Sequence, residues 1–464
     1  MYDLIVIGSG LSSFAFLKGL KTAKKKICII SYENESTKIK IESENIDYKN
    51  LPPRLKLNKK NKKNIVDFYE KNNFKIDSRT SIFGIVSHGG VSDYWGCSNE
   101  DLNVNKINFL NKKNKNLIKK ANIFFNNRYY SSDLKKNRIL NNKNQKNYVD
   151  LKNKLLNYKS KFFKFYNNTT AYNEKKKLEF RPANYFKEIN KKIKLYNYFV
   201  DKIRKRKKYY EIYCDGKKGK TIFRARKIVL AAGTFSTTRI VCEMLKFKNK
   251  IKVYHNPMLF GVFTSRYLIQ NKESRMPPSD FALKINDKLT NSSLIANFRR
   301  INKTIEKKIF QNFRQANNYL FKKIFNIFKF KLIFTNLYLS NKFSNIFFKY
   351  DDKEFKIYSD YKKTKINNKL LKRNFQRIYK YLKLKNLITF LHHSYVPETG
   401  SDSHFIGTIP ISKKKNKLSL NENCELKNFK NLFIVDGSSI PKNNLKFPTN
   451  LIICNAYRIG RLIK

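Results

Sequence analysis

Cysteines are few in this chain, and they are widely spaced. The 464 residues include six cysteines, and no two of them stand at the spacing of a metal site or of a redox-active pair. We therefore expect no metal centre and no disulfide framework, and reduced thiols favour a cytoplasmic location. The cysteines are Cys28, Cys97, Cys214, Cys242, Cys424 and Cys454.

Long hydrophobic runs are also missing. No stretch approaches the roughly 18 uninterrupted apolar residues of a membrane-spanning helix. The first expected strand begins at Tyr2, which leaves no room for a signal peptide. We therefore expect neither a membrane span nor a leader. A set of apolar residues at helical spacing, flanked by lysines, is typical of a buried helix face, with an interfacial helix as the alternative; it comprises Leu320, Phe321, Ile324, Phe325 and Phe328.

Acidic residues are scarce relative to basic ones. The chain has 34 Asp and Glu against 99 Lys and Arg, a net charge of +65 that by itself suggests nucleic acid or an anionic membrane as a partner. No compact basic motif, zinc-finger spacing or aromatic RNA-binding signature accompanies this charge. The residues in excess are also those with A- and T-rich codons. We expect a solvated basic surface and no specific nucleic-acid partner, with peripheral contact to an anionic membrane left open.

The chain is longer than one hydrophobic core usually supports, so we expect two interleaved domains. Strand, Gly-rich turn, helix and strand follow one another near the N-terminus, which indicates α/β architecture. We assign 1–110, 191–250 and 391–464 to one discontinuous domain and 111–190 to a peripheral helical insertion. Aromatic-rich strands over 251–390, with a hairpin-like pause at 351–353, predict a second, α+β domain. Further expected strands cover 195–203, 209–214 and 228–230.

A dinucleotide-binding fingerprint stands at the N-terminus. An apolar strand from Tyr2 to Ile7 leads into a G-x-G-x-x-S turn, and a helix is predicted to begin near Leu11. Gly8 permits the tight turn, and Gly10 lets the backbone approach a pyrophosphate at the positive end of that helix. Ser13, the third small position, still allows close helix packing. The second strand, 27–30, is followed by Glu33, a carboxylate that can accept hydrogen bonds from a ribose.

NAD and FAD share this fingerprint, and three distant segments favour FAD. The segments 87–96 (SHGGVSDYWG), 227–234 (KIVLAAGT) and 432–441 (LFIVDGSSIP), the last followed by Pro448-Thr449, resemble the glucose-methanol-choline (GMC) oxidoreductase family. The resemblance implies a Rossmann-type FAD-binding domain with an interleaved substrate, or cap, domain. The cofactor-binding residues it implies, with those of the fingerprint, are Gly8, Gly10, Ser12, Ser13, Glu33, Gly89, Gly90, Ser92, Tyr94, Val200, Ala232, Gly233, Asp436, Gly437, Pro448 and Thr449.

Within this family the sequence is most similar to the pyranose-oxidase-like branch. In that branch a Trp follows a flavin-linked His in the Gly-Gly segment, and here Tyr94 stands before Trp95 in place of that His. We therefore expect FAD to be held noncovalently. The same resemblance favours a sugar or glycan hydroxyl as substrate, while the electron acceptor (oxygen, a quinone or an electron carrier) stays open.

One of the five histidines stands in a catalytic context. His404 begins a segment, HFIGT, that resembles the family's H-x-x-G-T motif with its active-site base. A neutral imidazole can take the alcohol proton while hydride leaves carbon for flavin N5. His392 and His393 are competitors without a following Gly-Thr pair, and we expect structural roles for His88 and His255.

The family's second catalytic residue is replaced. An Asn or His is usual just before the C-terminal Pro-Thr, and this chain has Phe447 there. Asn450 is our candidate for the missing hydrogen bond, with Asn444 as an alternative. We expect an FAD-dependent alcohol dehydrogenase or oxidase. The alternative is a catalytically impaired protein that retains flavin and binds an anionic glycan or membrane surface; a nucleic-acid-binding protein is the third hypothesis.

Overall fold

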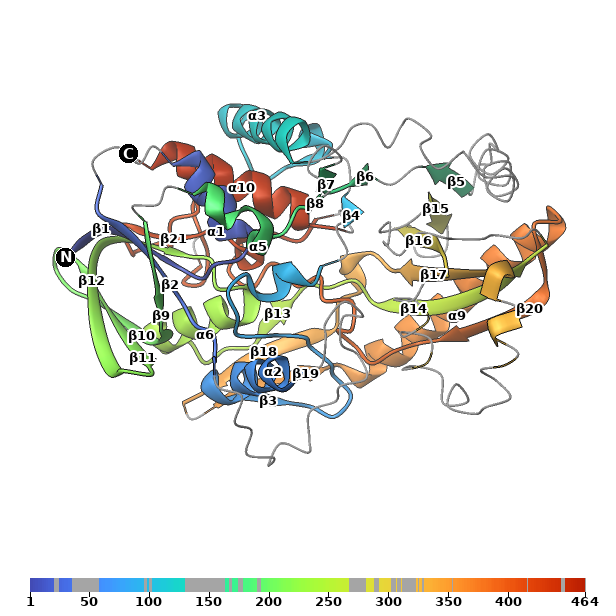
Figure 1. The fold of residues 1–464 in the computed structure, drawn as a ribbon, viewed down its shortest axis with the longest axis horizontal. Coiled ribbons are helices and arrows are strands. Elements are labelled where there is room, and N and C mark those ends of the chain that lie inside the picture. Colours follow the sequence, from blue (N-terminus) through green and yellow to red (C-terminus); the bar gives the residue numbers. More distant parts are fainter. Residues whose placement is uncertain are drawn as a thin grey trace.

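The computed structural model has two large sheets, one at each end of an elongated molecule (Figure 1). Both termini lie beside the first sheet. The structure describes residues 1–20, 25–35, 58–95, 98–99, 102–129, 163–166, 169–173, 178–189, 193–266, 281–287, 292–301, 306, 310, 323, 325–327, 329–352, 354–414, 416–443 and 447–463.

The first sheet gathers strands from three distant parts of the chain. Its order is β10-β11-β12-β1-β2-β9, with β21 added beside β12. The pairs β9–β2, β2–β1, β1–β12 and β12–β21 are parallel, whereas β10, β11 and β12 form an antiparallel meander. The strands are β1 (Tyr2–Ile7), β2 (Ile27–Ser31), β9 (Lys194–Asn197), β10 (Phe199–Lys205), β11 (Tyr210–Gly216), β12 (Gly219–Leu230) and β21 (Leu432–Ile434).

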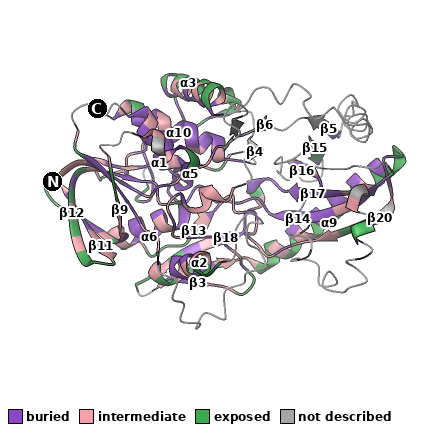
Figure 2. Cartoon of the chain, viewed as in Figure 1, coloured by how far each residue is buried: buried purple, intermediate pink, exposed green. Residues whose placement is uncertain are grey.

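Three helices share a hydrophobic core with this sheet: α1 (Leu11–Gly19), α6 (Thr234–Leu245) and α10 (Thr449–Leu462). Two glycines allow α1 and α10 to touch backbone to backbone: a Cβ on Gly19 would lie 2.2 Å from the Tyr457 carbonyl oxygen, and one on Gly460 would lie 2.1 Å from that of Phe16. Helix α3 (Lys112–Arg128) packs on α10, where the rings of Phe124 and Tyr457 stack at 5.0 Å. Buried residues run along the strands and through α1 and α10 (Figure 2).

A small sheet lies between the two large ones, in the lower part of the view in Figure 1. Its order is β13-β18-β19-β3, and α2 (Lys59–Lys71) precedes β3. The predicted hairpin pause is confirmed, since β18 and β19 are joined at Asp352, whose φ is +41°; Lys353 lies outside the described residues. The strands are β3 (Phe74–Ile76), β13 (Ile251–Val253), β18 (Ile346–Asp351) and β19 (Glu354–Ser359).

The second large sheet, which we call the cap sheet, is antiparallel. Its order is β20-β14-β17-β16-β15-β5. One face packs on the long helix α9 (Tyr361–Leu384), where Gly261 makes room for the ring of Phe375. The other face carries Met258, Phe260 and Phe334 toward the interior of the molecule. The strands are β5 (Phe163–Tyr166), β14 (Met258–Ser265), β15 (Phe281–Asp287), β16 (Ser292–Arg300), β17 (Leu332–Tyr338) and β20 (Ile388–Tyr395).

The remaining described elements are short. Strands β4 (Ser98–Asn99) and β6 (Thr169–Thr170) pair, as do β7 (Tyr172–Asn173) and β8 (Leu178–Glu179). In the described part of the chain, no helix combines the length and hydrophobicity needed to cross a bilayer. The short helices are α5 (Pro182–Tyr185) and the 3₁₀ turns Gly90–Asp93, Val104–Lys106, Phe186–Glu188, Lys329–Lys331, Asn341–Phe343 and Gly437–Ser439.

Two of the predicted elements need correction. The single strand expected over 195–203 breaks at Tyr198, because β9 continues the parallel sheet whereas β10 opens the meander. The insertion over 111–190 is not simply helical and peripheral, since β5 pairs with β15 in the cap sheet. Of the apolar set near 320–328, Phe325 is buried, and the side chains of the other four members lie outside the described residues.

Candidate active site

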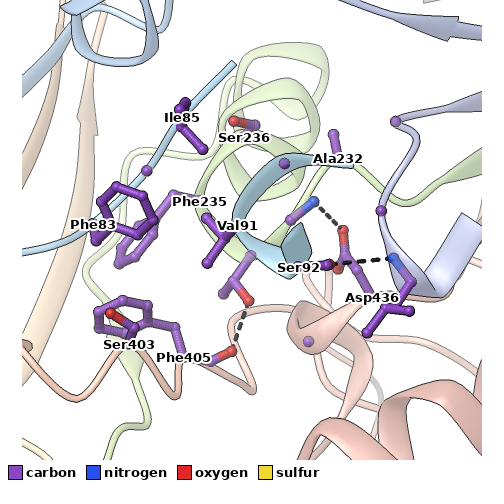
Figure 3. Close-up of a pocket in the computed structure, with 18 of the residues that line it drawn as sticks. Phe83, Ile85, Val91, Ser92, Ala232, Phe235, Ser236, Ser403, Phe405 and Asp436 are labelled. Carbon is purple, nitrogen blue, oxygen red and sulfur yellow. Dashed lines mark hydrogen bonds between the residues drawn. The ribbon is translucent and has the colours of Figure 1, made fainter. Parts of the chain in front are cut away.

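A cavity of about 430 Å³ is lined by residues of both the first sheet and the cap sheet. Figure 3 draws part of its wall. Its wall begins at the turn after β1, continues along the Gly-Gly segment 87–95, and ends at the cap strands and the segment 401–405. A concave, mostly apolar site of several hundred Å³ with a few polar groups is typical of cofactor and small-molecule binding. Segments far apart in the sequence therefore meet around one site.

The first end of the cavity is the turn between β1 and α1. Gly8 has φ of +103°, and a Cβ there would lie 2.3 Å from the carbonyl oxygen of Ala231, so only glycine fits. Helix α1 has no acidic residue in its first turn and no side-chain cap at Gly10. Its amide groups and positive dipole end therefore suit an anion. These features fit the pyrophosphate of a dinucleotide.

The small residues of this turn have separate roles. Ser12 lines the cavity, whereas Ser13 is buried and its hydroxyl donates to the carbonyl oxygen of Gly8. Glu33 does not line the cavity; its neighbour Tyr32 does, while the Glu33 carboxylate pairs with Lys60 at 3.3 Å. A ribose contact from Glu33 therefore stays a prediction.

The Gly-Gly segment is tied directly to this turn. The amide of Gly89 donates to the Ser9 hydroxyl at 3.0 Å, and the Ser92 hydroxyl accepts from the amide of Leu11 at 3.2 Å. Gly89 and Gly90 both have positive φ, +94° and +56°, and a Cβ on Gly90 would meet no atom within 4 Å. Backbone is thus presented to open space along this part of the cavity.

The residues that follow the glycine pair also reach the cavity. Tyr94 and Trp95 line it, and the Trp95 indole donates to the carbonyl oxygen of Phe180 at 3.0 Å. Burial raises the pKa of Tyr94, which keeps the phenol neutral at physiological pH. Figure 3 shows Phe83 and Phe405 on one side of the view and Asp436 on the other.

Asp436 links the ends of β12 and β21. Its carboxylate accepts from the amide of Gly233 at 2.9 Å, from the amide of Ser438 at 3.0 Å and from the Thr237 hydroxyl. Burial raises the pKa of Asp436, although these hydrogen bonds oppose the rise. The carboxylate therefore holds the part of the cavity wall around Gly233. Gly233 has φ of +87°, and a Cβ added to it would meet no atom within 4 Å.

Three of the four remaining predicted cofactor residues line the cavity. Val200, Gly437 and Thr449 line the cavity, and a Cβ on Gly437 would lie 2.6 Å from the Phe405 carbonyl oxygen. Pro448 caps the start of α10 and does not line the cavity. Of the 16 predicted cofactor-binding residues, the wall of the cavity thus omits Ser13, Glu33 and Pro448.

His404 lies at the cap end. Among the five histidines, all within the described residues, it is the one that lines the cavity. Its ring lies 5.2 Å from that of Phe447 and 5.6 Å from that of Tyr338, measured between centroids. Nδ1 is buried, has no hydrogen-bond partner among the described residues, and lies 3.8 Å from Asp402 Oδ2. Burial lowers the pKa of His404, and the nearby carboxylate of Asp402 opposes this.

Asp402 is held firmly by groups behind His404. It accepts from the amide of Asn256 at 2.9 Å and from the His404 amide at 3.2 Å, and its Oδ1 lies 2.9 Å from Nδ1 of His255. Burial, the largest single effect, favours the neutral acid, but His255, His404 and the Asn256 amide together lower the pKa of Asp402. The ring of His255 is fully buried, and its Nε2 lies 2.9 Å from the amide oxygen of Asn345. A structural position for His255 agrees with the sequence interpretation.

The structure places Asn450 away from the cavity. Its amide lies on α10 and donates to the Asn122 side chain of α3 at 2.9 Å. The Cys454 thiol donates to the oxygen of the same amide at 3.6 Å. The structure gives no support to the hypothesis that Asn450 replaces the family's second catalytic residue, because the side chain bonds between two helices. Asn444, the alternative, lies outside the described residues.

Sequence reasoning missed a polar group on the cap sheet. Arg299 of β16 and Asn336 and Tyr338 of β17 line the cavity near His404. Alternation along β17 was the available signal, since Phe334, Asn336 and Tyr338 share one face of a strand. Which face turns inward depends on α9 covering the other one, and that information is not local.

Comparisons with known proteins identify the fold. No family model matches the sequence, and no curated protein matches it by sequence. The crystal structure of pyridoxine 4-oxidase from Mesorbium loti is similar, with a TM-score of 0.62 at 11% sequence identity, over 100% of this chain and 99% of that chain. The predicted fold class, a Rossmann-type α/β domain with an interleaved α+β domain, is confirmed over the full length. The comparison gives no support to the pyranose-oxidase-like branch.

Proposed function

We propose that this chain is an FAD-dependent oxidoreductase of the GMC family that oxidises the CH–OH group of an alcohol, with His404 as general base. The observation that carries the proposal is the shared cavity: the dinucleotide turn at Gly8 and Gly10 lines the same cavity as His404. The fold likeness to pyridoxine 4-oxidase supports the same class of chemistry.

The residues along the cavity fit FAD. The start of α1 would receive the pyrophosphate, and the backbone at Gly89, Gly90 and Gly233 would lie against the cofactor, since open space stands over the latter two. Bound FAD supplies a two-electron acceptor for hydride. Noncovalent binding is proposed because Tyr94 stands where the related branch has its flavin-linked His. Acid precipitation should therefore leave the flavin in the supernatant.

His404 moves the proton in this proposal. A lowered pKa keeps its imidazole neutral at pH 7, and Nε2 can accept the proton of an alcohol hydroxyl in the cavity. The carboxylate of Asp402, whose Oδ2 lies 3.8 Å from Nδ1 of His404, would stabilise the imidazolium that forms. General-base catalysis of this kind contributes roughly 10²–10⁴ in rate, about 3 to 5 kcal/mol.

The substrate is a small alcohol. A sugar or glycan hydroxyl is the substrate predicted from the sequence. The name of the structural neighbour, pyridoxine 4-oxidase, makes an aromatic alcohol a second candidate, which the rings of Phe334, Tyr338 and Phe447 at the cap end favour. Oxygen as electron acceptor is proposed on the same likeness.

A flavin-retaining protein without turnover is the second candidate function. It is favoured by Phe447, whose ring packs edge-on against His404 where the family places a polar partner. Protein that purifies with FAD but is not bleached by any alcohol would support it.

Substitution of His404 tests the proposed catalysis. We expect His404→Asn to lower the rate of anaerobic flavin reduction by alcohol about 10²- to 10⁴-fold while FAD stays bound. His393→Asn is the matched control, because His393 lies exposed on β20 and does not line the cavity. Equal reduction rates in the two variants would remove His404 from the mechanism.

A further inference from the structure

Two buried polar side chains of the cap sheet are not used in the proton transfer to His404. Asn336 and Tyr338 lie two residues apart on β17, so they share one face of that strand, and both line the cavity. Each is only 5% exposed. Phe334 and Phe447 line the same end of the cavity. Buried polar groups among aromatic rings are costly unless each finds a hydrogen-bond partner.

The two side chains bond to each other and leave one donor and one acceptor unused. The amide nitrogen of Asn336 donates to the Tyr338 hydroxyl at 3.0 Å. The amide oxygen has no hydrogen-bond partner among the described residues, and the phenol's own proton reaches no acceptor in that part of the chain. Burial raises the pKa of Tyr338, so the phenol keeps this proton at physiological pH.

The pair offers the same two functions whichever way the amide is turned. With the amide nitrogen toward Tyr338, the phenol donates to a ligand and the amide oxygen accepts from it. With the amide oxygen toward Tyr338, the phenol oxygen accepts and the amide nitrogen donates. A ligand must therefore accept one hydrogen bond and donate one. A neutral hydroxyl does both with a single oxygen atom, whereas a carboxylate, an ether or an ammonium group does only one of the two.

The hydroxyl that is oxidised does not meet this requirement. In the proposed oxidation its single proton goes to His404, so none is left for Asn336 or Tyr338. The rings of Tyr338 and His404 lie 5.6 Å apart between centroids, which lets one small molecule reach both. The group that satisfies the pair is therefore a second hydroxyl of the same molecule.

We propose that Asn336 and Tyr338 bind a second hydroxyl group of the substrate, so that the protein selects diols and polyols over alcohols with one hydroxyl. The two residues then determine specificity, and they hold the substrate with its reacting hydroxyl at His404. This inference rests on the proposed function, because it names the substrate class of that same site.

Matched diols and simple alcohols test the inference on the full-length, FAD-loaded protein. We choose the ortho, meta and para isomers of benzenedimethanol, which place the second hydroxyl at three different distances. Each is compared with the methylbenzyl alcohol of the same substitution by anaerobic stopped-flow reduction of the flavin. At least one diol should have a half-saturation concentration about 5- to 150-fold below that of its counterpart, the worth of two neutral hydrogen bonds.

Two variants assign this preference to the pair. Tyr338→Phe removes the hydroxyl and keeps the ring that packs on His404 and Phe447, and Asn336→Leu replaces the amide by an apolar group of similar size. Each should bring the diol and its counterpart to within about threefold of each other. Tyr361→Phe, an exposed site at the start of α9, is the control. An equal loss of rate with every alcohol in Tyr338→Phe would assign Tyr338 to the reacting hydroxyl and overturn the inference.

A binding measurement separates this inference from the proposed chemistry. Neither 4-methylphenol nor 4-methylanisole has an oxidisable CH–OH group, and only the phenol can donate a hydrogen bond. Calorimetric titration of the native protein should show 4-methylphenol binding at least about fivefold more tightly than 4-methylanisole, with the difference lost in Asn336→Leu.

The outcomes are distinct. Preferential binding of 4-methylphenol that depends on Asn336, with no alcohol bleaching the flavin, would support the hydroxyl site and overturn the proposed oxidation. Equal reduction by diols and simple alcohols, with equal binding of the two aromatic ligands, would overturn the inference and leave the oxidation standing. If the variants fail to retain flavin, the native protein still decides, because an absence of both preferences overturns the inference.

Discussion

His404 lies between a buried carboxylate and two aromatic rings, and this environment sets its protonation. Burial lowers its pKa from the ordinary value of 6.5, with Asp402 opposing. A general base must be neutral to accept a proton. The rate of flavin reduction should therefore stay constant from alkaline pH down past 6.5 and fall only in more acidic solution. Stopped-flow reduction across a pH series checks this; a loss of rate that begins above pH 7 would contradict it.

Asn450 gives the opposite expectation. Its side chain joins α10 to α3 through Asn122 and does not line the cavity. Asn450→Ala should leave the rate of flavin reduction within about threefold and lower the free energy of unfolding by about 1–3 kcal/mol, because the Asn122 amide loses its buried partner. Thermal unfolding and stopped-flow reduction measure the two effects. A large fall in reduction rate with unchanged stability would return Asn450 to the site.

At the scale of an element, the β1–α1 turn does not accept a side chain at Gly8. Gly8→Ala would place a methyl group 2.3 Å from the Ala231 carbonyl oxygen at a φ of +103°. The turn must shift, and we expect the purified variant to lack FAD. Gly219→Ala is the control, because Gly219 also has positive φ, +86°, but a Cβ there meets nothing within 4 Å. The ratio of flavin to protein absorbance reports the result, and equal ratios for the two variants would refute the role of this turn.

The same scale shows why some elements were predictable and others were not. The strand before Gly8 and the helix after it follow from local apolar pattern and glycine spacing, and both stand where the sequence predicts them. The break at Tyr198 and the pairing of β5 with β15 depend on partners far away in the chain. Likewise, a local motif in the C-terminal segment was enough to predict His404 as a site residue. Arg299 and Asn336 could not be predicted in this way, because their place on the cavity wall depends on which face of the cap sheet α9 covers.

At the scale of the whole molecule, the fold is similar to that of a solved structure although the two sequences are not. A full-length structural match at 11% identity coexists with no match to any family model. The glycine at position 8 is required by the backbone geometry at that end of the cavity, which is why its pattern can be recognised by inspection of the sequence. For the net charge of +65, a solvated basic surface without a specific nucleic-acid partner stays a prediction that rests on the codon argument.

The central claim is that one cavity holds FAD and an alcohol together. The most direct measurement is the visible absorption spectrum of the purified full-length protein, followed anaerobically as sugars, aromatic alcohols and hydroxy acids are added. We predict flavin bands that bleach with one class of alcohol and return when an electron acceptor is admitted. Colourless protein that takes up no added FAD would contradict the account.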